Sequence, residues 1–132
     1  MENKEEIFNN QEESKKIEEK IIESIIIHSK ESNSNYKLAN KHFRNYTKLM
    51  CNVLEKNNEI LYKLIEHEEP SIKSVGAYFL LQFDKNVAEK TLKSLYKITR
   101  DTIGFNAKMI MREWKSKRLK FPKLKEGKII YE

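Results

Sequence analysis

The sequence predicts an all-α protein built as a short antiparallel stack of five to six helices. Only 3 Gly and 2 Pro occur in 132 residues, which leaves few turn positions and disfavours sandwiches, barrels and hairpin-rich folds. Apolar residues recur at steps of three and four along much of the chain, as they do on one face of a helix. Lys, Glu and Leu are abundant and form helices readily. At this length we expect a single helical domain.

Two helices are expected in the N-terminal part. The first begins at Ser14, because Ile17, Ile21 and Ile25 fall on one face, whereas residues 1–13 lack a periodic apolar pattern and are expected to fray. A polar run over residues 29–35 separates it from the second helix. The second helix has the clearest pattern, a stripe at alternating steps of three and four: Tyr36, Ala39, Phe43, Tyr46, Met50 and Val53.

Further helices are expected toward the C-terminus. A short one covers residues 60–65, and Pro70 suits the first position of the next. Residues 71–83 are apolar nearly all round, which predicts a central, buried helix. Asp84 marks the start of a further helix, and Asp101 or Thr102 caps the last one.

The spacing of these helices suggests a repeat. Residues 57–83 and 86–118 form two helix pairs that repeat about every 35 residues, the layout of a HEAT- or ARM-repeat-like α-solenoid fragment. The expected helical-repeat domain covers residues 14–119. Residues 120–132 lose the helical period and form a basic C-terminal tail, in which residues 129–131 pack back or extend as an edge segment.

Several of these residues resemble a known family. The corner His67-Glu68-Glu69-Pro70, followed by a basic residue and an Ala-containing helix, is the most telling part. With the segment 40–43, the similarity spans residues 36–119 and includes Leu54, Leu61, Leu64, Ala77, Leu80, Leu81, Ala88, Leu92, Leu95, Ala107 and Trp114. The chain resembles a small bacterial family of stand-alone ARM/HEAT-like domains, classed only as a domain of unknown function.

The resemblance implies a fold but no reaction. This chain departs from the family pattern at Lys73, where Arg is usual, and at Gly76, where Ala is usual. Gly inside a helix costs about 1 kcal/mol unless close backbone packing offsets it. Relatives associated with toxin and secretion loci make an immunity role, neutralising a cognate toxin, an expectation by analogy only.

The sequence is typical of a cytoplasmic protein. Cys51 is the single cysteine, which excludes an internal disulfide and suggests a reducing compartment. The N-terminal residues lack the basic flank and apolar run of a signal peptide. The longest apolar runs are far shorter than a membrane span requires, so we expect no membrane partner.

No catalytic, cofactor or metal site emerges from the motifs. His42 and Cys51 are nine residues apart and do not share a helix face, and the corner at His67 lacks the i, i+4 ligand spacing of a helical zinc site. We interpret that corner as one whose His or Glu caps a helix end. His28 and His42 border apolar faces, which favours a core-edge role over catalysis. The sequence contains no nucleophile motif, no glycine-rich phosphate loop and no evident small-molecule site. We therefore expect a protein that is not an enzyme.

Charge is distributed unevenly along the chain. Residues 1–32 contain nine Glu and five Lys, whereas residues 112–128 contain eight Lys or Arg and two Glu. On the last expected helix, Lys108, Arg112 and Lys115 align at steps of four and three, and Arg118 continues the charge. Phe105 and Met109 lie off the apolar face, which places them among the candidate partner-binding residues. Trp114 shares the apolar face and is expected to anchor it.

Three functions remain open from the sequence. The favoured hypothesis is a non-enzymatic protein-interaction module, in which residues 71–83 and 103–118 present a shallow surface to another protein. The first alternative is a nucleic-acid-associated protein that uses the basic C-terminal third to contact phosphates. The second is the immunity role. A further interpretation of the basic residues is simply a solvated, solubilising surface.

Overall fold

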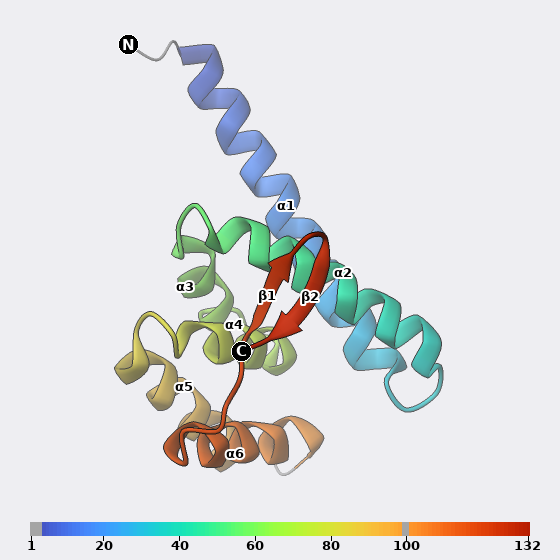
Figure 1. The fold of residues 1–132 in the computed structure, drawn as a ribbon, viewed down its shortest axis with the longest axis vertical. Helices are drawn as coiled ribbons and strands as arrows, with labels where there is room; N and C mark the ends of the chain where they lie inside the picture. The colour runs from blue at the N-terminus through green and yellow to red at the C-terminus, as the bar shows by residue number, and fades with distance from the viewer. Residues whose placement is uncertain (1–3, 99–100) are drawn as a thin grey trace. The chain divides into compact units, whose positions relative to one another are not determined.

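A computed structural model describes residues 4–98 and 101–132, with side chains described from residue 11 onward. The described part is mostly helical, which confirms the all-α prediction (Figure 1). Its elements, in chain order, are α1 (Lys4–Glu31), α2 (Tyr36–Leu54), α3 (Glu59–Ile65), α4 (Pro70–Leu80), α5 (Lys85–Ile98), α6 (Thr102–Lys115), β1 (Pro122–Lys125) and β2 (Lys128–Tyr131).

The chain divides into two compact units, Met1–Met50 and Cys51–Glu132. The sequence pattern suggested one helical domain over residues 14–119 and gave no sign of a division. The boundary falls inside the continuous helix α2, where no change in composition or turn residue marks it.

The first unit contains α1 and most of α2. Helix α1 begins at Lys4, well before Ser14, so helix extends into the segment expected to fray. Helix α2 begins at Tyr36, as expected, and the amide of Leu38 donates to the side chain of Asn35 at 3.2 Å, which caps its first turn. The ring of His28 in α1 lies 5.3 Å from that of Phe43 and 5.9 Å from that of Tyr46 in α2. These ring contacts join the two helices.

The second unit is an antiparallel helical stack. Helix α3 packs on α4, α4 on α5, and α5 on α6, and α4 also contacts α6. Pro70 occupies the first turn of α4, as its missing amide hydrogen allows. The central position expected for this helix is confirmed, because it contacts α3, α5 and α6 and six of its eleven residues are buried: Ser71, Ile72, Gly76, Ala77, Phe79 and Leu80. Leu61, Leu64, Leu92 and Leu95 complete this core.

The basic tail folds into an antiparallel β-hairpin, which the sequence pattern did not predict. Strand β1 pairs with β2 (Figure 1), and in their register Lys123 faces Ile130 and Lys125 faces Lys128. Glu126 and Gly127 form the two-residue turn with φ values of 51° and 75°, as a turn between right-twisted strands requires. Asn and Asp are the usual residues at the first turn position, and Glu in their place hides the hairpin signal.

None of the helices in the described part of the chain combines the length and apolar composition of a membrane span.

Candidate protein-binding surface

Helix α6 is held in place by its cap and by one small-residue face. The carboxylate of Asp101 accepts hydrogen bonds from the amides of Ile103 and Gly104 at 3.1 and 3.3 Å, so Asp101 is the capping residue. Gly104, Ala107 and Met111 are buried, in keeping with the packing of α6 against α5 and α4. The outer face of α6 is thereby left to solvent.

The outer face carries a stripe of five side chains, here called the α6 stripe: Phe105, Lys108, Met109, Arg112 and Lys115. Every one of them is exposed, including 63% of Phe105 and 36% of Met109. Phe105 and Met109 are one turn apart and form an apolar line. Lys108, Arg112 and Lys115 form a cationic line beside it at steps of four and three. The structure thus brings together five of the six residues that the sequence singled out.

The cations of the α6 stripe have no acidic partner among the described side chains, those of residues 11–98 and 101–132. Arg118, the sixth candidate, differs from them. It follows the end of α6, and its guanidinium contacts the carboxylate of Glu113 at 3.3 Å. Lys117 adopts φ of 61°, which turns the chain away from the helix axis before Arg118. Arg118 is therefore not part of the stripe.

Trp114 lies on the other side of α6, in an aromatic cluster with the tail. Its ring meets that of Phe121 edge-on at 6.2 Å, and Phe121 stacks on Tyr78 at 5.0 Å. Trp114 itself is half-buried, whereas Phe121 is buried. The Tyr78 hydroxyl donates to the carbonyl of Lys120, and burial raises the pKa of this phenol. Phe121, which the sequence analysis did not single out, therefore joins the tail to α4 and α6.

Three of the remaining chemically versatile side chains have structural contacts, whereas Nδ1 of His42 is buried without a hydrogen-bond partner among the described residues. His67 Nδ1 accepts from the amide of Glu69 at 3.1 Å within the corner, but no side chain of the corner caps the N-terminus of α4. The pKa of His28 is lowered by burial against its aromatic neighbours. Cys51 Sγ lies 3.5 Å from the carbonyl oxygen of Pro122, and burial raises the pKa of this thiol. Among the described residues, no three His, Cys, Asp or Glu side chains gather as a metal site would require.

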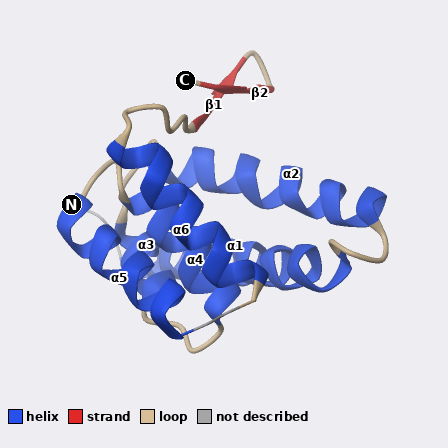
Figure 2. Ribbon diagram, turned by 90° about the horizontal axis from the view of Figure 1, so that it is seen from below, coloured by secondary structure: helices blue, strands red, loops and turns tan. Residues whose placement is uncertain are grey.

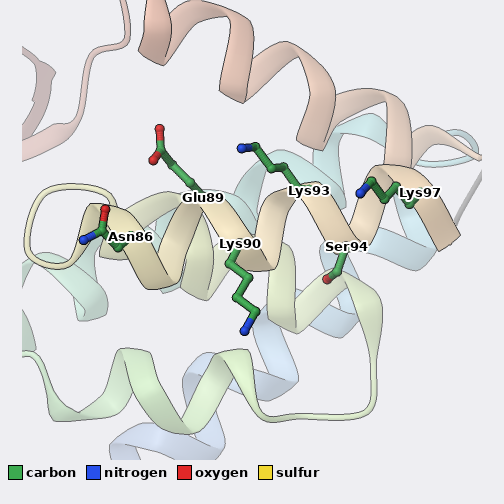
Figure 3. Close-up of a pocket in the computed structure, with 6 residues that line it drawn as sticks. All are labelled: Asn86, Glu89, Lys90, Lys93, Ser94 and Lys97. Carbon is green, nitrogen blue, oxygen red and sulfur yellow. The ribbon is translucent and has the colours of Figure 1, made fainter.

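A shallow depression follows the surface of α5 (Figure 3). All of its described lining residues come from this one helix: Asn86, Glu89, Lys90, Lys93, Ser94 and Lys97. Figure 3 shows Glu89 and Lys93 extending to one side of the helix and Lys90 to the other. The side chains do not converge on a common point, so the depression lacks the geometry of a small-molecule site.

Comparisons with known proteins give no relative: no known family, curated protein or solved structure matches the chain.

Proposed function

We propose that the chain is a non-enzymatic interaction module that binds an acidic, amphipathic protein segment through the α6 stripe. The observation that carries this proposal is the exposed pair Phe105 and Met109 on one helix face, beside cations that have no acidic partner among the described side chains. Helix α4, the other helix expected to present a surface, buries six of its eleven residues. The proposal therefore rests on α6 alone.

The composition of the α6 stripe favours a protein partner over nucleic acid. Removing exposed apolar surface from water stabilises a complex by about 25 cal/mol per Å². A phosphate backbone offers little apolar surface to cover Phe105 and Met109, whereas an amphipathic helix offers both apolar and acidic side chains at the same spacing. The cationic line supports the nucleic-acid alternative through its charge, since Lys108, Arg112 and Lys115 are all exposed.

We also propose that the second unit follows a HEAT- or ARM-like plan, as in the family that the sequence resembles. The order of packing supports it: α3 pairs with α4, α5 pairs with α6, and the second helix of each pair contacts the other. In such stacks, the helices of one face commonly form the binding surface.

A defined probe tests the binding proposal. The probe is a fluorescent helical peptide with Leu residues four apart and Glu residues on the adjacent line, titrated with the chain and followed by anisotropy. The expected result is saturable binding that weakens in the triple variant Lys108→Glu, Arg112→Glu and Lys115→Glu. A matched control reverses three lysines on α5, namely Lys90, Lys93 and Lys97, and should retain binding.

The same titration distinguishes the alternative function. Duplex DNA replaces the peptide at low salt, where electrostatic attraction is strongest. Binding to DNA with a steep loss as salt rises, together with no binding to the peptide, would replace the proposal with the nucleic-acid role. Equal peptide binding by the parent and the triple variant would show that the α6 stripe is only a solvated face.

A further inference from the structure

The hairpin has two outer edges, and they differ. Phe121 and Glu132 exchange backbone hydrogen bonds at 2.9 and 3.0 Å, so alternate residues of each strand point their amide and carbonyl groups inward. The backbone hydrogen-bonding groups that point outward therefore belong to Pro122 and Leu124 on β1 and to Ile129 and Tyr131 on β2.

The edge of β1 is blunted. Pro122 has no amide hydrogen to offer, and its carbonyl already lies against Cys51 Sγ at 3.5 Å. On β2, the backbone groups of Ile129 and Tyr131 have no hydrogen-bond partner outside the hairpin in the part of the chain that the structure describes. In Figure 2 the hairpin stands apart from the ribbons of α3 to α6. An unpaired strand edge of this kind is a template for another strand.

We propose that β2 pairs with β2 of a second copy of this chain, in antiparallel register centred on Ile130. A two-fold axis at Ile130 sets Ile129 opposite Tyr131 of the second copy, so that both outward residues of each strand exchange hydrogen bonds. A two-fold axis at Ile129 would leave Tyr131 without a partner in β2 of the second copy. An axis at Tyr131 would likewise leave Ile129 without one. The two hairpins then join into one continuous sheet.

Charge complementarity selects the same register. With the axis at Ile130, Lys128 lies directly opposite Glu132 of the second copy, and the pair occurs twice by symmetry. Within one hairpin, by contrast, Lys128 faces Lys125, a like-charged pair. Lys125 reaches Glu132 at 2.6 Å instead, which leaves Lys128 without an anionic partner among the side chains of residues 11–98 and 101–132. A second copy supplies that partner.

A charge swap tests the register by sedimentation velocity over a range of protein concentrations. Lys128→Glu should weaken dimerisation at least about fivefold, because Glu then faces Glu132, although the like-charged pair in the hairpin is relieved. Glu132→Lys should weaken it as well. The double variant Lys128→Glu/Glu132→Lys restores opposite charges across the axis and should recover dimerisation relative to Glu132→Lys alone, since both variants lack the Lys125–Glu132 contact.

A cysteine variant tests the geometry independently. Residues facing each other across the axis have Cα atoms about 4.5 Å apart, within reach of a disulfide. Ile130→Cys should therefore oxidise rapidly to a covalent dimer, whereas Lys123→Cys on the other strand should not. A parent chain that remains monomeric at every concentration, or equal oxidation rates of the two cysteine variants, would overturn the proposal. So would a monomer that instead adds a strand from an unrelated peptide.

Discussion

A Cβ atom at Gly76 would lie 2.7 Å from Cβ of Leu64 and 3.2 Å from the backbone nitrogen of Ile65. Helices α3 and α4 pack so closely at this point that only the hydrogen atom of glycine fits where another residue has Cβ. The closeness of this crossing explains a glycine in a buried helix, where Ala would otherwise be favoured by about 1 kcal/mol.

Gly76→Ala should destabilise the protein even though it raises helix propensity. Overpacking costs typically 1–3 kcal/mol, and the propensity gain offsets about 1 kcal/mol of it. Because Cβ of Leu64 cannot move away by a side-chain rotation, we expect the upper part of the overpacking range and a net loss of roughly 1–2 kcal/mol in the free energy of unfolding, measured by urea denaturation. Asn106→Ala, on the exposed side of α6, is the matched control and should be neutral or slightly stabilising. Equal gains in the two variants would show that α3 and α4 do not approach this closely.

His28 should make the stability of the protein depend on pH. Burial lowers its pKa below the ordinary 6.5, so the unfolded chain binds a proton at pH values where folded His28 is still neutral. Stability should therefore be fully present above pH 6.5 and decline as the pH falls through 6.5 toward the lower folded-state pKa. Thermal melting between pH 7.5 and 5 measures this decline. The decline should be smaller in His28→Leu than in His67→Gln, and identical curves for the two would refute it.

Phe121→Ala should destabilise the protein more than Trp114→Ala does. Phe121 is only 7% exposed and contacts both Tyr78 and Trp114, whereas Trp114 is half-buried. Removing a buried Phe costs about 3–5 kcal/mol. The comparison uses denaturant midpoints of the two variants. The reverse order would return Trp114 to the role of main anchor that the sequence pattern suggested.

Lys117→Gly should stabilise the protein. Lys117 has φ of 61°, in the left-handed region that costs a non-glycine residue roughly 1–2 kcal/mol. Part of the gain is offset by the greater freedom of glycine in the unfolded chain, so we expect roughly 0.5–1 kcal/mol. Ser116→Gly, at φ of −83°, is the neighbouring control and should lose stability. Calorimetry of the two variants measures whether each one gains or loses stability relative to the parent.

The helices could be predicted because their signals are local. Tyr36 begins α2, Pro70 lies in the first turn of α4, and Asp101 caps α6, as the residue pattern indicated. The hairpin could not be predicted in this way. It depends on two consecutive residues at positive φ, one of them Glu126, and on the packing of Phe121 against Tyr78, which is 43 positions away in the sequence.

The α6 stripe was accessible from the sequence for the same local reason. Once residues 102–115 form a helix, the spacing of Phe105, Lys108, Met109, Arg112 and Lys115 fixes a common face. Arg118 fitted the charge pattern but not the geometry, because the helix ends at Lys115. The open edge of β2 depends on strand pairing, and helical periodicity carries no information about it.

Peptide binding by the double variant Phe105→Ser/Met109→Ser tests the proposed function most directly. Both side chains are exposed, so folding should be unchanged by circular dichroism, and the cationic line stays intact. If the apolar line contacts the partner, anisotropy titration with the acidic amphipathic peptide at about 0.15 M salt should show at least a roughly tenfold loss of affinity, about 1.4 kcal/mol. An affinity equal to that of the parent would mean that charge alone attracts the peptide, and would contradict the proposed contact of the partner with the apolar line of the α6 stripe.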